Sequence, residues 1–136
     1  MAVRLLLLFL VAAFLESACS SVPVRDIGLD KLAPRKAEQA LSHGLESYEN
    51  GRYQMAANYL QDALTEGLAF KSDQVTAHKY LAFVYCVTNR RKQCREQFKA
   101  AMEINPNFAL SPAEGGHPIW GPVFAEVQAE QRSQNR

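Results

Sequence analysis

The chain has 136 residues, 48% of them hydrophobic and 21% charged, which fits one globular domain and excludes a large multidomain enzyme. Fifteen Lys and Arg residues against fourteen Asp and Glu residues give a formal net charge of +1. This balance predicts no overall electrostatic field that would gather a nucleic acid, so we expect no nucleic-acid partner.

Residues 1–18 are typical of an export signal. Arg4 precedes an unbroken run of eleven apolar residues that ends at Leu15. This run has the length of a signal-peptide core and falls well short of the roughly 20 residues that a membrane-spanning helix needs. The sequence therefore predicts that the mature chain is exported.

The segment Ser17-Ala18-Cys19-Ser20 resembles the bacterial lipoprotein signal, although Glu16 stands where that family places Leu. The resemblance implies cleavage before Cys19, a lipid on Cys19 and a membrane attachment through that lipid. Because Ser20 follows the cysteine in place of Asp, it also implies the outer membrane, with the domain on the periplasmic face. The alternative is an ordinary secretory signal cut after Ser20, which would leave a soluble periplasmic protein.

Residues 19–33 contain Pro23 and Gly28 and show little periodicity, which predicts a tether. From Pro34 onward, apolar residues recur every three or four positions, as they do along amphipathic helices. The pattern predicts four helices: one from Pro34 to Asn50, one from Tyr53 to near Gly67, one capped by Ser72 and continuing to Tyr85, and one from Arg91 to Ile104. No stretch alternates with period two, so we expect an all-α domain.

Residues 34–108 divide into two similar halves at an offset of 38 residues. Each half has a small residue in its first helix, a turn residue, and a small residue in its second helix: Gly44, Gly51 and Ala56 in the first half, and Ala82, Asn89 and Cys94 in the second. The arrangement resembles the tetratricopeptide repeat, and Pro106 matches the Pro that ends such a unit. The first half lacks this Pro, and the offset exceeds the family's period of about 34 residues. The resemblance implies two stacked helix hairpins with a face that binds peptides or another protein's helix.

Residues 109–136 are predicted to cap the second hairpin, because two repeats alone leave apolar outer faces exposed. After the turn-rich residues 111–118, Trp120 and Pro122 introduce a short amphipathic helix that contains Phe124. Trp120 has two interpretations. It is either a core residue of this cap or an exposed anchor for a partner.

Cys86 and Cys94 form an even pair once Cys19 is assigned to the lipid, and an oxidising compartment favours a disulfide between them. In the repeat alignment, Cys94 holds the small crossing position and Cys86 lies one turn beyond Ala82, so the two side chains are expected on facing surfaces. A metal site is disfavoured by the Cys-x7-Cys spacing. Two unpaired buried thiols remain the other alternative.

The charges are separated along the repeats. Residues 37–73 contain six acids against two bases, and residues 74–105 contain six bases against two acids. This separation predicts that Arg91, Lys92 and Arg95 steer a complementary protein partner, or that the chain associates head to tail. Ordinary solvated helix faces explain the same pattern.

His43, His78 and His117 are scattered without the paired spacing of metal ligands, so we expect no metal and no other cofactor. We expect a non-enzymatic interaction module that scaffolds or assembles a larger envelope machine. Small lipoproteins of similar plan include pilotins and accessory proteins of secretion and pilus systems. The alternatives are a soluble periplasmic chaperone and a small hydrolase or thiol enzyme that uses His117 or the pair Cys86 and Cys94. The sequence leaves the partner's identity and the oligomeric state open.

Overall fold

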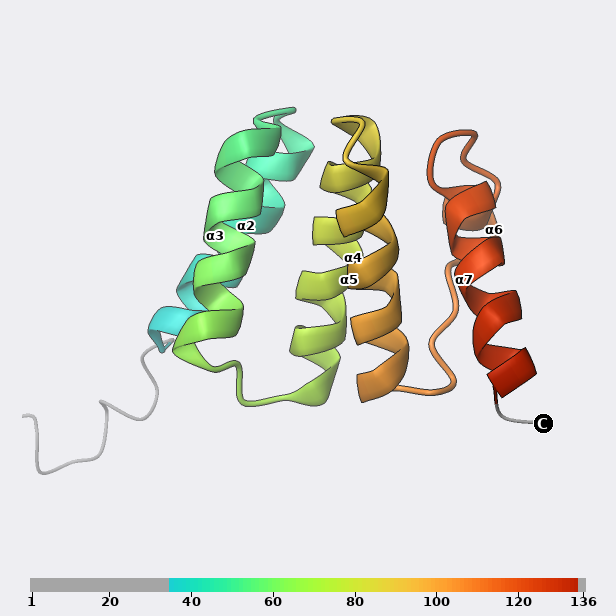
Figure 1. The fold of residues 1–136 in the computed structure, drawn as a ribbon. Helices are drawn as coiled ribbons and strands as arrows, with labels where there is room; N and C mark the ends of the chain where they lie inside the picture. The colour runs from blue at the N-terminus through green and yellow to red at the C-terminus, as the bar shows by residue number, and fades with distance from the viewer. Residues whose placement is uncertain (1–34, 135–136) are drawn as a thin grey trace, which may run out of the picture. The chain divides into compact units, whose positions relative to one another are not determined.

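The computed structural model describes residues 35–134, and this part of the chain is all-helical, as predicted (Figure 1). The predicted signal peptide, the tether, Cys19 and the helix start at Pro34 lie outside the described residues. The helices are α2 (Lys36–Glu49), α3 (Tyr53–Glu66), α4 (Lys71–Val87), α5 (Arg91–Ile104), α6 (Pro112–Gly115) and α7 (Gly121–Gln134).

Short turns fold these helices into two antiparallel hairpins, α2 with α3 and α4 with α5 (Figure 1). Gly51 and Asn89 stand at equivalent positions of the two turns and have φ angles of 69° and 60°. This left-handed region disfavours most residues and is adopted most readily by Gly and Asn. The turn residues therefore determine where the first helix of each hairpin stops.

The start of α4 corrects one prediction. Ser72 lies inside the first turn of this helix, which begins after Phe70, and no side chain caps it. The backbone N–H groups of Asp73 and Gln74 instead bond the carbonyl of Phe70, both at 3.1 Å. Backbone hydrogen bonds therefore start the helix. The negative carboxylate of Asp73 in the first turn interacts favourably with the positive N-terminal end of the helix dipole.

The hairpins stack side by side, with α4 in contact with both α2 and α3. Small residues allow the close approach within the first hairpin, since a Cβ added to Gly44 would lie 2.7 Å from Cγ of Leu60. Between the hairpins, the Gln61 amide of α3 donates a 2.6 Å hydrogen bond to the hydroxyl of the buried Tyr85 in α4. The two units are therefore joined by a polar contact as well as by apolar packing.

The apolar core continues from the hairpins into the C-terminal segment. Phe124 of α7 packs against Phe98 of α5, with ring centroids 5.2 Å apart, and against Phe108, at 5.7 Å. Val123 and Val127 of α7 are almost fully buried. Burying one large apolar side chain stabilises a fold by about 1.5–3 kcal/mol. Because α7 buries several such side chains against the hairpins, it is part of the same folded unit.

The C-terminal segment differs from its prediction in two details. Helix α7 runs for 14 residues and is longer than the short helix expected. The turn-rich segment also contains the single-turn helix α6, whose N-cap Ser111 forms a capping box with Glu114. The Ser111 backbone N–H donates to Glu114 Oε2 at 2.9 Å, and the Glu114 N–H donates to Ser111 Oγ at 3.3 Å. These reciprocal bonds satisfy free N–H groups at the start of the turn.

Cys86 and Cys94 are joined by a disulfide, with their Cα atoms 5.2 Å apart. The predicted bridge is thereby confirmed. It links the last turn of α4 to the first turn of α5, next to the Asn89 turn.

Among the helices between residues 35 and 134, none has the combination of length and apolarity needed to cross a bilayer.

Candidate functional site

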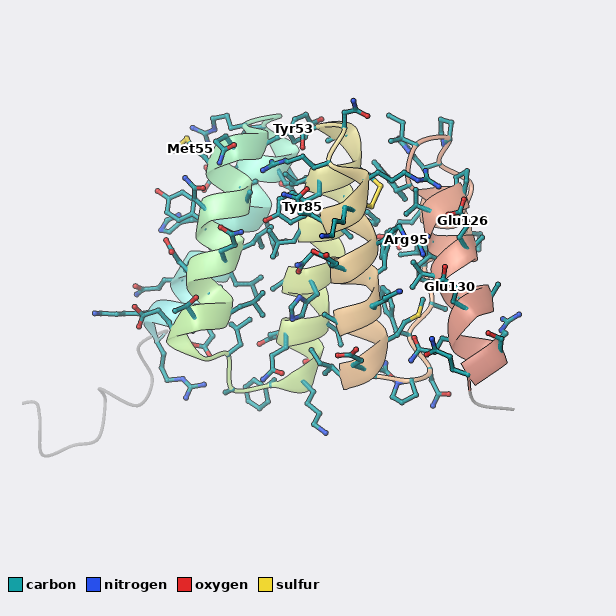
Figure 2. The ribbon with its side chains drawn as sticks, viewed as in Figure 1. Tyr53, Met55, Tyr85, Arg95, Glu126 and Glu130 are labelled. Carbon is teal, nitrogen blue, oxygen red and sulfur yellow. A yellow bond between two sulfur atoms is a disulfide. The ribbon has the colours of Figure 1, made fainter. Side chains whose placement is uncertain are left out.

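The basic residues predicted to meet a partner lie on α5, and two of them contact α7 (Figure 2). Arg91 donates hydrogen bonds to both carboxylate oxygens of Glu126, at 2.7 and 2.8 Å. Arg95 donates to Glu126 at 2.9 Å and also to Glu130. Lys99 extends this row with a 3.1 Å ion pair to Glu130.

The hydrogen bonds from Arg95 and Lys99 lower the pKa of Glu130 below its ordinary value, so this carboxylate is ionised at neutral pH. Much of the positive charge of α5 is thus balanced inside the chain. The third predicted base, Lys92, is highly exposed and lies 3.9 Å from Glu96 of its own helix. The unpaired positive charge on the surface of α5 is therefore smaller than the count of six bases in residues 74–105 indicates.

Trp120 is a core residue of the cap, with only 8% of its surface exposed. Its ring stacks on Phe83 at a centroid distance of 4.4 Å, and its indole N–H donates to the carbonyl of Glu114 at 2.8 Å. The interpretation of Trp120 as an exposed partner anchor is therefore wrong. Its apolar ring and its single hydrogen-bond donor therefore both make contacts inside the fold.

The residues considered for enzyme chemistry have structural contacts. His117 stacks on Trp120, and its Nδ1 accepts the backbone N–H of Ile119 at 3.2 Å. His78 Nδ1 lies 2.7 Å from Gln97 Oε1. The sulfurs of Cys86 and Cys94 are bonded to each other, so neither is a thiol nucleophile in this state. Within the described range, no group of three or more His, Cys, Asp or Glu side chains could hold a metal ion.

A cluster that the sequence did not single out lies on α2, α3 and α4. We name Tyr48, Tyr53 and Tyr80 the tyrosine face. The ring centroid of Tyr48 lies 5.0 Å from that of Tyr80 and 5.9 Å from that of Tyr53. Tyr53 is 37% exposed, and the other two rings are partly exposed. Three helices therefore bring three phenol groups to one surface.

The tyrosine face is supported from below by the core. Tyr80 contacts the buried Phe83 with ring centroids 5.7 Å apart, and Phe83 in turn stacks on Trp120. Leu45, Val87 and the rings of Tyr48 and Tyr80 pack against the core while staying partly exposed. Leu45 and Tyr48 in α2, and Tyr80 and Val87 in α4, recur at helical spacing. This spacing is the sequence signal that could have placed them on one face of each helix.

One ion pair borders the tyrosine face. Lys79 Nζ lies 2.6 Å from Glu114 Oε1, with side-chain exposures of 20% and 26%. The same ammonium lies 4.9 Å from the ring centroid of Tyr80, within the range of a cation–π contact. This pair joins residues 35 positions apart in the sequence, so helix periodicity could not have predicted it.

The ionisation states at this face follow from those contacts. Burial alone would raise the pKa of Glu114, but hydrogen bonds from Lys79 and Ser111 outweigh it, and the pKa is lowered. Burial, aided by Tyr53, Tyr80 and the Glu114 charge, raises the pKa of Tyr48 to about 12. Near neutral pH, Tyr48 is therefore an uncharged phenol beside one anion and one cation that balance each other.

No family model, curated protein or solved structure matches the chain. A functional interpretation therefore depends on the sequence signals and on the geometry of the tyrosine face.

Proposed function

We propose that the chain is a non-enzymatic protein-interaction module and that the tyrosine face binds its partner. The observation that carries this proposal is the convergence of Tyr48, Tyr53 and Tyr80 at a partly exposed surface that rests on rigid core aromatics. Tyrosine is enriched at protein interfaces, where its ring buries apolar area and its hydroxyl forms hydrogen bonds. A supported, preformed surface also loses little conformational entropy on binding.

The proposal includes a tetratricopeptide-like character for the two hairpins. The turn residues Gly51 and Asn89, which are 38 positions apart, adopt the same left-handed conformation, and the small residues Ala56, Ala82 and Cys94 are fully buried. In stacked hairpins of this kind, the first helices of successive units lie next to each other. Tyr48 and Tyr80 stand on those first helices, α2 and α4, which are in contact.

The proposal also places the module in the bacterial cell envelope, attached to the outer membrane by a lipid on Cys19, where it would scaffold or assist a larger assembly. The Cys86–Cys94 disulfide supports an oxidising compartment, because such bonds are rare in the cytosol. Mass spectrometry of the mature N-terminus tests the anchor. We expect a triacylated Cys19, whereas an unmodified chain that begins at Ser21 would contradict the anchor and favour a soluble periplasmic chaperone.

Site-specific photocrosslinking in the producing cells tests the interaction itself. A photoreactive phenylalanine analogue replaces Tyr53 on the tyrosine face or, as a matched control, Tyr59, a partly buried tyrosine of α3 that packs against His43. We expect a discrete protein adduct at position 53 and none at position 59. Adducts at both positions in equal yield, or at position 59 alone, would contradict the tyrosine face as the binding site.

A further inference from the structure

We infer that Phe70 of one copy of the chain docks into a groove at the start of α4 of a second copy, and that the two copies make this contact reciprocally. The inference goes beyond the proposed function, because this surface uses none of the three residues of the tyrosine face. Three observations carry it: an exposed aromatic ring, an unfilled groove next to that ring, and the chemistry of the groove's lining.

Phe70 lies directly before α4 and exposes 66% of its surface, the largest fraction among the exposed large apolar side chains of residues 35–134. Its backbone is fixed, because its carbonyl accepts the N–H groups of Asp73 and Gln74 in the first turn of the helix. A single exposed ring is common on protein surfaces. The inference therefore depends on what lies next to the ring.

A groove with a volume of about 450 Å³ opens between the start of α4 and the end of α5, which lie at the same end of the second hairpin (Figure 1). Phe70 does not line this groove, although the next residue along the chain does, so the ring leaves the neighbouring groove unfilled. A cavity of about 150 Å³ is enough to hold a benzene-sized ring. The groove therefore has room for a phenylalanine side chain. Its lining residues are Lys71, Ser72, Val75, Ile104 and Asn105.

The lining of the groove suits an aromatic ring. Val75 and Ile104 are partly buried and offer aliphatic surface, and Lys71 offers an exposed ammonium group. A lysine ammonium close to the face of an aromatic ring makes a favourable cation–π contact, which adds to the apolar contact. The lining includes no acidic side chain that would neutralise Lys71. Phe70 of a second copy is thus an occupant of matching chemistry that the chain itself supplies.

The ring and the groove belong to one surface patch, since Phe70 and Lys71 are adjacent in the sequence. An interface about a two-fold axis brings the same patch of both copies together. A patch that carries both a projecting ring and a groove therefore makes two identical contacts at once. Each aromatic side chain buries about 150–250 Å², so two such contacts fall short of the roughly 1,200 Å² of a stable interface. We expect a weak dimer, which covalent capture detects best.

Photocrosslinking of the full chain in the producing cells tests the inference. Two copies with different epitope tags are produced together, and a photoreactive phenylalanine analogue replaces Phe70 in one of them. We expect an adduct that contains both tags, and we expect mass spectrometry to map the crosslink to residues 71–75 or 104–105 of the second copy. The control places the same analogue at Met55 of α3, whose side chain is 43% exposed, and should give no adduct that contains both tags.

A groove variant of the second copy makes the test specific. Ser72→Arg places a long side chain in the groove from an exposed position and leaves the core unchanged, so the yield of the two-tag adduct should fall by about tenfold or more. Asn58→Arg adds the same charge at an exposed position of α3 and should leave the yield unchanged. Immunoblots verify that both variants accumulate as the wild type does.

Three results would overturn the inference: no adduct from position 70, adducts with other proteins only, or a two-tag yield that Ser72→Arg leaves unchanged. None of these results bears on the tyrosine face, which the analogue at position 53 tests separately.

Discussion

At Gly44, the close approach of α2 and α3 leaves no room for a side chain. A methyl group at this position would lie 2.7 Å from Cγ and 2.8 Å from Cδ2 of Leu60, whose side chain is fully buried. Leu60 would have to move within a packed core, at a cost of about 1–3 kcal/mol. The gain in helix propensity, about 1 kcal/mol, offsets only part of that cost.

We therefore expect Gly44→Ala to lower the free energy of unfolding by up to about 2 kcal/mol, as measured by urea denaturation. Gly115→Ala is the matched control, because a Cβ added at Gly115 would lie 4.0 Å from Cβ of Leu110, which is an ordinary van der Waals contact. A Gly44→Ala variant as stable as the wild type would show that the crossing of α2 and α3 is looser than described.

Glu130 gives the protein a contribution to stability that depends on pH. Its pKa is lowered in the folded state by hydrogen bonds from Arg95 and Lys99, so folding favours the ionised carboxylate. The contribution is fully present above the unfolded pKa of about 4.3 and is lost as the pH falls through the lower folded pKa. Glu130→Gln should therefore be less stable than the wild type at pH 7 and should converge with it in strong acid.

Urea denaturation at a series of pH values between 7 and 2 measures this convergence. Glu103→Gln, at an exposed glutamate of α5, is the control, and its stability difference from the wild type should vary little over the same range. A Glu130→Gln variant whose deficit persists unchanged at pH 2 would contradict the role given to the ion pairs.

At the scale of the elements, the hairpins α2–α3 and α4–α5 follow from local signals. Apolar spacing of three and four residues, together with Gly51 and Asn89 at the turns, predicts four helices close to their observed ranges. Helix α6 was missed because its signal is the short capping box of Ser111 and Glu114, which lies in a segment without helical periodicity.

The row of ion pairs between α5 and α7 was not predicted, and the reason is physical. Arg91 and Arg95 meet Glu126 and Glu130 only after the chain has folded back over 31 to 35 residues. Charge counts over a sequence window register the bases and omit these carboxylates. Helical spacing places Tyr48 and Tyr80 on faces of their own helices, but only the fold brings α2, α3 and α4 together, so the tyrosine face as a cluster was not predicted.

The disulfide makes the hairpin α4–α5 sensitive to reduction. The bridge closes a loop with a sequence separation of 8, and cross-linking so short a loop stabilises a fold by about 2–3 kcal/mol. We expect dithiothreitol to lower the free energy of unfolding of the wild type by about that amount. A Cys86→Ala, Cys94→Ala double variant should show no response to the reductant, and an unchanged wild-type stability after reduction would contradict this account.

At the scale of the whole molecule, the ion pairs between α5 and α7 and the tyrosine face of α2, α3 and α4 lie on different helices. Arg91, Arg95 and Lys99 of α5 are paired with carboxylates of α7, whereas the tyrosine face is bordered by the ion pair of Lys79 and Glu114. The sequence indicated Arg91, Lys92 and Arg95 as the surface for a partner. Because Arg91 and Arg95 are paired with α7, we propose the tyrosine face on α2, α3 and α4 instead.

These two surfaces are compared most directly by mapping backbone amide chemical shifts of the full, isotope-labelled chain during titration with the most enriched peptide from a random phage-displayed library selected against the full chain. We predict that the largest perturbations centre on Tyr48, Tyr53 and Tyr80 and extend to Lys79, while the amides of α5 change little. Perturbations that centre on Arg91, Lys92 and Arg95, with the three tyrosines unaffected, would contradict the central claim that the tyrosine face is the binding site.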